Sequence, residues 1–124
     1  MLRPMADLSV DVPGLSMNNP LMLASGIQGA NAASLHRVAA SAAGGLVSKS
    51  IGPVPREMYP GPVCVEVMET VILNAMGLPN PGVDIFSEIV SNEQFSKPLL
   101  VSIFGSDAEG YVEVARKMAS AGAE

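Results

Sequence analysis

The sequence predicts an α/β fold in which a β-hairpin is followed by about three βα units. Short apolar runs bounded by turn residues alternate with segments whose apolar residues recur at the helical period. Such continuous runs are too short for helices and are typical of strands that are buried on both faces of a parallel sheet. Strands that alternate with helices in this way form βαβ units.

The first predicted elements are a hairpin and a buried strand. Residues 8–12 alternate apolar and polar side chains, and Pro13-Gly14 separates them from residues 15–17, which predicts a short antiparallel hairpin. Residues 21–24, Leu-Met-Leu-Ala, form a continuous apolar run bounded by turn residues. We therefore expect a strand there that is buried on both faces.

A helix and a second strand follow. Asn31 is a good N-cap residue, and Gly44-Gly45 is expected to end the helix that Asn31 begins. Residues 46–51 then predict a second strand, which makes a right-handed parallel βαβ unit. The apolar positions of the helix are Leu35, Val38, Ala39 and Ala42.

Residues 52–81 interrupt the alternation. Prolines at positions 53, 55, 60, 62, 79 and 81 exclude a long helix. The Val- and Ile-rich residues 63–73 predict a hairpin within this segment. Because ordered loops of this length inside compact domains are usually functional, we expect the segment to carry part of a site.

A helix and a third strand are predicted next. Residues 82–91 follow the helical period, with Ile85, Phe86 and Ile89 on one face. Residues 98–104 form another continuous apolar run, which predicts a buried strand.

The last predicted helix has the clearest local signals. Ser106 and Glu109 match a capping box, and Glu113 and Lys117 are spaced for an ion pair one helical turn apart. The predicted apolar stripe comprises Ala108, Tyr111, Val112, Ala115, Met118 and Ala119. This pattern predicts a helix with one buried face.

The composition excludes several classes of protein. The chain has 124 residues and a net charge of −5, which argues against binding to nucleic acid. A charged fraction of 15% with 48% apolar residues argues against disorder. The single cysteine, Cys64, excludes a multi-cysteine metal site, and no metal is expected. No apolar run is long enough to span a bilayer. Asp7 and Asp11 lie where a signal peptide would have its apolar stretch, so we expect a cytoplasmic protein.

The predicted elements together resemble an arc of a (β/α)₈ TIM barrel, in which active sites lie at the carboxyl ends of the strands. Three polar segments fall there: Ala24-Ser25-Gly26, Ser48-Lys49-Ser50 and Asn74 to Asn80. Small residues let a flat cofactor approach the backbone, and a lysine stabilises an anion. Asn amides and a backbone N–H at Gly77 suit a planar polar substrate.

Each segment also has a purely structural interpretation. Ala24-Ser25-Gly26 could be an ordinary turn, and the segment from Asn74 to Asn80 could be only a loop. Lys49 lies in an otherwise apolar strand, where a lysine is costly unless something pairs with it. Alternatively, its side chain extends along the strand end to reach solvent. The residues leave these alternatives open.

The three segments, taken in this order, resemble the N-terminal part of class 1 dihydroorotate dehydrogenases over essentially the whole chain. NPLMLASG at 19–26 resembles the first barrel strand of that family, and SKSIGPVPRE at 48–57 resembles its second strand and following loop. NAMGLPNPGVD at 74–84 resembles its substrate loop and is the most specific of the three. The resemblance implies an FMN-binding barrel that oxidises dihydroorotate to orotate in pyrimidine biosynthesis.

The resemblance also implies roles for individual residues. Residues at three strand ends would contact FMN: Ala24, Ser25, Gly26, Lys49, Ser50 and Ser102. Residues of the substrate loop would bind dihydroorotate together with Lys49: Asn74, Ala75, Met76, Gly77 and Leu78. The catalytic base of the family, a Cys or Ser in a motif like N-x-S-C-P-N, is expected beyond Glu124. Cys64 lies in the wrong loop for that role and is interpreted as a small buried apolar residue, and His36 as a surface residue.

Residues 1–124 are therefore interpreted as the N-terminal part of a single FMN-binding barrel domain, inactive without the rest. The GLPNPGVD segment is closer to class 1B, which passes electrons to NAD through a separate FAD and iron–sulfur subunit; the fumarate-using class 1A stays open. The full-length protein is expected to form a homodimer. Two other functions stay open: a related FMN barrel that reduces a dihydropyrimidine or dihydrouridine, and a non-enzymatic binding module.

Overall fold

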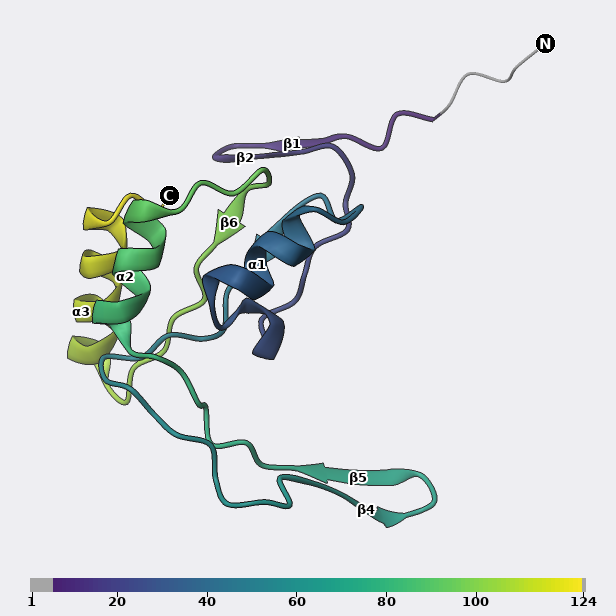
Figure 1. Cartoon of the computed structure of the whole chain (residues 1–124), viewed down its shortest axis with the longest axis vertical. Coiled ribbons are helices and arrows are strands. Elements are labelled where there is room, and N and C mark those ends of the chain that lie inside the picture. The colour runs from purple at the N-terminus through teal and green to yellow at the C-terminus, as the bar shows by residue number, and fades with distance from the viewer. Residues whose placement is uncertain (1–5, 124) are drawn as a thin grey trace.

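The computed structural model describes residues 6–123, and its elements follow the predicted order except that the first parallel strand is reduced to a single bridge (Figure 1). The elements are β1 (Val10–Val12), β2 (Leu15–Met17), the 3₁₀ turn η1 (Ile27–Gly29), α1 (Ala32–Ala39), β3 (Leu46–Val47), β4 (Cys64–Met68), β5 (Val71–Asn74), α2 (Val83–Asn92), β6 (Leu99–Leu100) and α3 (Ala108–Ser120). The α/β content expected from the sequence is confirmed, as is the antiparallel pairing of β1 with β2.

Three segments pair side by side in parallel, with β3 in the middle. Met22 forms a parallel bridge with Gly45, β3 pairs with β6, and Ile51 forms a parallel bridge with Ile103. The amide of Leu23 donates to the carbonyl of Gly45 at 3.0 Å, which joins the first segment to the second. The carboxyl ends of all three segments therefore meet at one edge.

The prediction that residues 21–24 are buried on both faces is wrong for the described chain. Leu21 is 67% exposed, and Met22 and Leu23 are only half-buried. The reason is that this segment pairs on one side only, with the chain at residues 44–47. The middle segment, which has a neighbour on each side, contains the fully buried Leu46 and Ile51.

The core lies between the middle strand and the three helices. Its buried members are Leu35, Ala39, Leu46, Ile51, Val83, Phe86, Val114 and Met118. Asn31 caps α1 as predicted, by accepting a hydrogen bond from the amide of Ser34 at 2.9 Å. However, α1 ends at Ala39, before Gly44-Gly45, because residues 40–43 turn out of the helix.

The predicted faces of α2 and α3 need correction. Ile85 is 52% exposed, and Val83 takes its place beside Phe86 in the core. In α3, Tyr111 and Val112 are 46% and 45% exposed, whereas Val114 and Met118 are buried. Periodicity identifies residues that share a face, but it does not tell which face another element covers.

The N-terminus of α3 also differs from the predicted capping box. Asp107, not Ser106, is the N-cap residue, and its carboxylate accepts from the amide of Gly110 at 2.8 Å. Both residue types cap well, and the chain enters the helical conformation one residue later than predicted.

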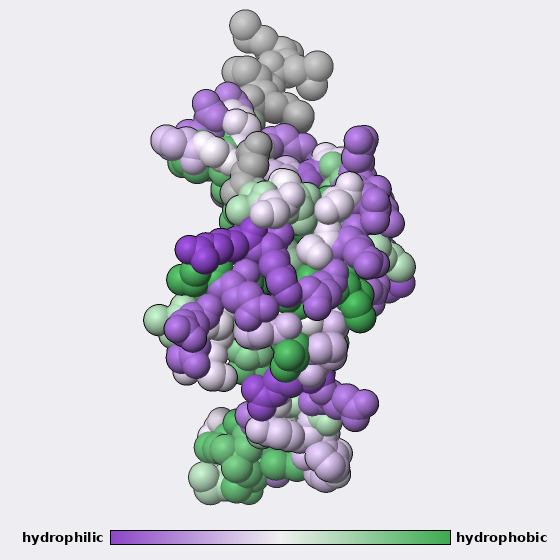
Figure 2. All heavy atoms as spheres, turned by 90° about the vertical axis from the view of Figure 1, so that its left-hand side faces the viewer, coloured by the Kyte–Doolittle hydropathy of each residue, from purple (hydrophilic) through white to green (hydrophobic). Residues whose placement is uncertain are grey.

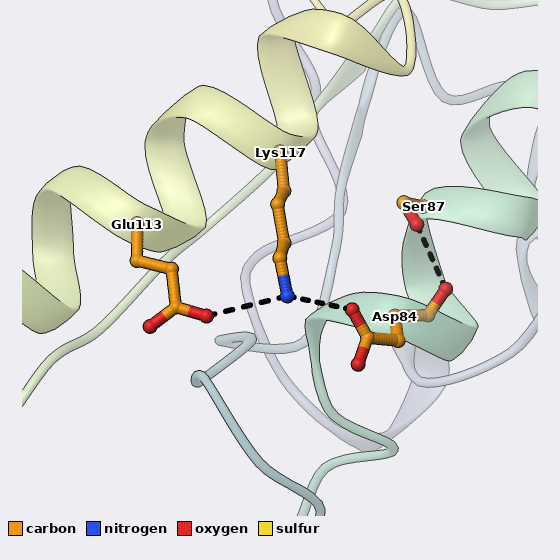
Figure 3. A network of polar contacts seen from close by, with 4 residues as sticks. All are labelled: Asp84, Ser87, Glu113 and Lys117. Carbon is orange, nitrogen blue, oxygen red and sulfur yellow. Dashed lines mark hydrogen bonds and ion pairs between the residues drawn. The ribbon is translucent and has the colours of Figure 1, made fainter.

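An ion-pair network joins α2 to α3 on the surface (Figure 3). Lys117 Nζ lies 2.7 Å from Asp84 and 3.2 Å from Glu113, so the predicted pair within α3 is confirmed and extended to α2. Hydrogen bonds from the ammonium to Asp84 and Glu113 raise the pKa of Lys117 above its ordinary value.

The predicted hairpin at 63–73 is confirmed as β4 and β5, which project away from the helices (Figure 1). Apolar residues gather on the surface at this lower end of the molecule (Figure 2). They include Val65, Val67, Met68, Ile72 and Leu73. Cys64 is exposed on β4, which corrects the interpretation of that residue as buried, because both faces of the hairpin are open.

Two further findings concern the described residues as a whole. Between residues 6 and 123, no helix is long and apolar enough to cross a membrane. Over the same range, no cluster of His, Cys, Asp and Glu side chains is arranged to hold a metal ion.

Candidate active site

Three serine hydroxyls form a row across the carboxyl ends of the parallel segments. The Oγ of Ser50 lies 3.3 Å from that of Ser25 and 2.9 Å from that of Ser102. Ser25 follows the first segment, and Ser50 and Ser102 lie near the carboxyl ends of the second and third, so these sequence-predicted cofactor residues do come together. Ser25 is exposed, whereas Ser50 and Ser102 are half-buried, so the row opens to the surface at its Ser25 end. Each hydroxyl can donate or accept a hydrogen bond.

Lys49 is buried beside this row. Its side chain is only 9% exposed, and it lines two neighbouring hollows of about 350 and 300 Å³. The larger hollow is lined by Lys49, Arg56, Tyr59, Asn74, Met76, Gly77 and Leu78. Met76 also lines the smaller one. Lys49 therefore lies where the predicted cofactor residues meet the predicted substrate loop, and its side chain is not extended freely into solvent.

The larger hollow is electropositive. Among the described residues that line it, Lys49 and Arg56 are cations and none is a carboxylate. Within residues 6–123, no carboxylate oxygen lies within 4.0 Å of either cation. The chain as a whole carries a charge of −5, so this local excess of positive charge is a property of the site.

The turn η1 is in direct backbone contact with the strand that carries Lys49. The amide of Lys49 donates to the carbonyl of Gly29 at 2.8 Å. A Cβ on Gly29 would lie 2.5 Å from the carbonyl oxygen of Val47, which is closer than side-chain carbons approach. Gly29 is thus needed for this contact, and no pattern in the sequence indicated it.

The substrate loop has an unusual backbone at Gly77 and Leu78. Their φ angles are +85° and +53°, and a left-handed conformation is strained for Leu78 because of its side chain. A Cβ on Gly77 would lie 3.0 Å from the ring of Tyr59, so this tyrosine packs on the backbone of the loop. The amide of Tyr59 donates to the carbonyl of Met76 at 3.0 Å, which joins the loop to the chain that precedes β4. Such strain is common where a loop is shaped to bind a ligand.

Not all predicted residues take part in the hollows. The amide of Ala75 already donates to the carbonyl of Val63 at 2.8 Å, and Ala75 lines neither hollow. The predicted cofactor residues other than Lys49 also lie outside both hollows: Ala24, Ser25, Gly26, Ser50 and Ser102.

Asn80 ends the polar segment predicted at 74–80, where sequence reasoning assigned it no role of its own, and its side chain joins three parts of the site. It is 7% exposed, and its Oδ1 accepts from the amides of Gly52 at 3.1 Å and Gly82 at 2.9 Å. Its Nδ2 donates to the carbonyl of Leu78 at 3.0 Å. The side chain of Asn80 thus joins three segments: the chain just after Lys49 at Gly52, the strained loop at Leu78 and the start of α2 at Gly82.

Arg56 and Tyr59 are the other two residues that sequence reasoning missed. Both are brought to the hollow by antiparallel pairing of the residues after Lys49 with the substrate loop. The amide of Arg56 donates to the carbonyl of Asn80 at 2.9 Å, and the amide of Asn80 donates back at 3.0 Å. The only available signal was the position of Arg56 within the SKSIGPVPRE motif.

Comparison with known proteins decides the family. A family model described as dihydroorotate dehydrogenase matches residues 7–123. The chain belongs to the dihydroorotate dehydrogenase family. The family indicated by the three sequence motifs is thereby confirmed.

Three curated proteins are similar to this chain over most of its length. The protein of Thermoplasma acidophilum is 46% identical over 97% of this chain and 40% of its own length. The protein of Thermococcus kodakarensis is 46% identical over 91% of this chain and 37% of its own length. The protein of Pyrococcus furiosus is 42% identical over 93% of this chain and 38% of its own length. Each is named dihydroorotate dehydrogenase B (NAD(+)), catalytic subunit, which confirms the class 1B resemblance. The chain spans about 40% of the length of these curated relatives.

The two remaining candidate residues lie away from the site. Cys64 is on β4 and lines neither hollow. His36 is 45% exposed on α1 and lies 2.8 Å from Glu93, with its ring against Phe95. The interpretation of His36 as a surface residue is confirmed.

Proposed function

We propose that the protein oxidises dihydroorotate to orotate, with FMN as its cofactor, in de novo pyrimidine synthesis. We further propose that residues 1–124 form the N-terminal part of a single (β/α)₈ barrel domain. The order of the parallel segments, 21–24 beside 45–51 beside 99–104, supports the barrel proposal because successive strands are neighbours in such a barrel. The observation that carries the functional proposal is the junction at Lys49 between a hydroxyl row and an electropositive hollow.

The donor set at the strand ends fits FMN. The polar edge of a flavin ring presents both carbonyl oxygens and N–H groups, and each of the three serine hydroxyls can pair with either kind. FMN supplies a two-electron acceptor when it is bound. The roles of this chain would be to hold the ring through Ser25, Ser50 and Ser102, and to place the ammonium of Lys49 beside it. A fixed cation there stabilises negative charge that develops during the reaction.

The larger hollow fits a planar substrate with a carboxylate and amide groups. Lys49 and Arg56 supply positive charge for the carboxylate, and Asn74 offers an amide that can both donate and accept. Gly77 and Leu78 present backbone to the same hollow, which lets a flat ring approach closely. Because none of the described lining residues is a Cys or Ser, we propose that the base that removes the substrate proton comes from elsewhere in the protein.

The names of the relatives support a proposal about partners. Since the relatives are named catalytic subunits of NAD(+)-dependent type, we propose that electrons leave through a separate subunit that carries FAD and an iron–sulfur cluster. We also propose that the protein is a cytoplasmic homodimer. Size measurement of the purified protein with and without such a subunit tests both assemblies.

A substrate panel tests the proposed function. The protein is expressed from its complete reading frame, and oxidation is followed with a dye as electron acceptor. We expect turnover of dihydroorotate, with dihydrouracil and dihydrouridine at least tenfold poorer because neither carries the carboxylate that two cations would bind. Faster turnover of a substrate without a carboxylate would instead favour a related pyrimidine reductase. A protein that binds neither flavin nor orotate would favour a non-enzymatic module.

A pair of matched variants tests the site itself. Lys49→Met and Arg37→Met each remove one positive charge, but Arg37 is exposed on α1, away from both hollows. We expect Lys49→Met to lower kcat/KM for dihydroorotate at least tenfold, since buried charged contacts to a ligand are strong. Arg37→Met should match the wild type. Equal activity of the two variants would contradict the assignment of Lys49.

A further inference from the structure

The strand that carries Lys49 slips by one residue against its neighbour. Val47 pairs with Leu100, whereas Ile51 pairs with Ile103. Residues 48–50 therefore lie opposite residues 101–102 only. An extra residue on one strand is a β-bulge, a feature that often re-aims a side chain beside an active site.

The bulge changes which atom accepts the amide of Ser102. In an uninterrupted parallel ladder the acceptor would be the main-chain carbonyl of residue 48. Instead the amide of Ser102 donates to the side-chain Oγ of Ser48 at 2.9 Å. The same hydroxyl donates to the carbonyl of Lys49 at 2.9 Å. Ser48 is 0% exposed, so one buried hydroxyl satisfies a backbone donor and a backbone acceptor on two adjacent strands.

The slip also changes the alternation of side chains along the strand. Leu46 and Ser48 are both fully buried, and the next fully buried side chain is Ile51 rather than residue 50. A regular strand would direct residue 50 to the face of Leu46. The bulge thus leaves Ser50 free to join the hydroxyl row, between Ser25 and Ser102. It also leaves the side chain of Lys49 against the hollows.

We propose that Ser48 is a positioning residue, whose hydroxyl holds the bulge that aims Lys49 into the substrate hollow and Ser50 into the serine row. This role rests on the proposed function, since it concerns the same site. Ser48 is 0% exposed and both bonds of its hydroxyl go to the backbone, so it would touch no ligand itself. Its effect on binding would pass through Lys49 and Ser102.

Variants at Ser48 test the proposal in the protein expressed from its complete reading frame. Ser48→Ala removes the hydroxyl, Ser48→Thr keeps it, and Ser48→Cys replaces it with a weaker hydrogen-bonding group of similar size. Ser87→Ala is the control, because the Ser87 hydroxyl also donates to a backbone carbonyl, that of Asp84 at 2.8 Å, but lies on α2 away from the site.

The first measurement is hydrogen exchange of the peptide that contains Ser102, which does not depend on the proposed function. Ser48→Ala should speed exchange at the Ser102 amide, Ser48→Thr should preserve protection, and Ser48→Cys should lie between them. If Ser48→Ala does not fold, Ser48→Cys against Ser48→Thr makes the same comparison. Unchanged exchange in the variants without the hydroxyl would overturn the proposal.

The second measurement is the Kd for orotate, taken well below the unfolding temperature. Loss of the buried hydrogen bonds should weaken orotate binding about tenfold in Ser48→Ala, with recovery in Ser48→Thr and no change in Ser87→Ala. Faster exchange with an unchanged Kd would overturn the positioning role. If the wild-type protein binds no orotate, the proposed function fails first, and this role fails with it, whatever the exchange measurement shows.

Discussion

Replacement of Asn80 should destabilise the protein more than any exposed polar substitution. The Oδ1 of Asn80 accepts from the amides of Gly52 and Gly82, and all three residues are buried. Asn80→Ala would leave both amides without a partner and without access to water. A buried donor left unsatisfied costs about 1–3 kcal/mol, so two of them cost about 2–6 kcal/mol. That is a large part of the roughly 5–15 kcal/mol that stabilises an ordinary domain.

Two further variants separate the causes of that loss. Asn80→Asp keeps the acceptor oxygen for both amides, but it replaces the donor Nδ2 with an oxygen that faces the carbonyl of Leu78 and it buries a charge, so it measures those two costs without orphaning either amide. Its negative charge would also lie near the N-terminus of α2, where it is favourable. Asn92→Ala is the matched control, because Asn92 is exposed at the other end of the same helix and should change stability by less than about 0.5 kcal/mol.

Urea unfolding of the protein, expressed from its complete reading frame, measures these differences. The midpoint and the slope together give the change in the free energy of unfolding. A loss below about 1 kcal/mol in Asn80→Ala would refute the argument from orphaned amides.

Three other substitutions have definite expected outcomes. Gly77→Ala should lower the free energy of unfolding by about 1–2 kcal/mol and weaken orotate binding, because the φ of +85° disfavours a side chain and the new Cβ would press on the ring of Tyr59. An unchanged thermal midpoint and an unchanged Kd would contradict this. Asp107→Ala should lower the free energy of unfolding in urea by about 1 kcal/mol, and Ser106→Ala by less than about 0.5 kcal/mol. A larger loss in Ser106→Ala would instead show that Ser106 is the N-cap residue. Lys117→Met should slightly lower the thermal midpoint at neutral pH. Because the folded pKa of Lys117 is raised, its ion pairs contribute below its ordinary pKa, and the difference from wild type should vanish as the pH rises through the raised pKa. A difference that persists there would contradict an ionic origin.

Elements that depend on neighbouring residues were predictable from the sequence. The cap at Asn31 and the pair of Glu113 with Lys117 form as expected, because each needs only residues three or four positions apart. The cap of α3 was wrong by one residue because Ser106 and Asp107 are adjacent and cap about equally well. Local signals therefore identify an element more securely than its first residue.

Burial was less predictable because it depends on long-range packing. Ile85, Tyr111 and Val112 follow the helical period, yet all three are exposed in the described chain. Leu21 lies in a continuous apolar run, yet pairing on one side only leaves it exposed. The sequence pattern of one segment does not indicate which of its faces another segment will cover.

In the candidate site, too, local motifs were predictable and long-range contacts were not. Two of the three motifs carry Lys49, Asn74 and Gly77, and the structure brings these residues to one hollow. Asn80 and Arg56 lie within the motifs, but their roles were not predicted, because these come from a backbone pairing between segments far apart in the chain. The bulge at residues 48–50 was missed as well, since it becomes visible only when the register against residues 100–103 is known.

A crystal structure of the protein with orotate tests the central claim most directly. That claim is that the hollow beside Lys49 binds a planar pyrimidine carboxylate at the strand ends. The structure is expected to show orotate between Lys49 and the loop at residues 74–78, with its carboxylate toward the positive side chains. Orotate bound away from Lys49, or a carboxylate turned away from both cations, would contradict it.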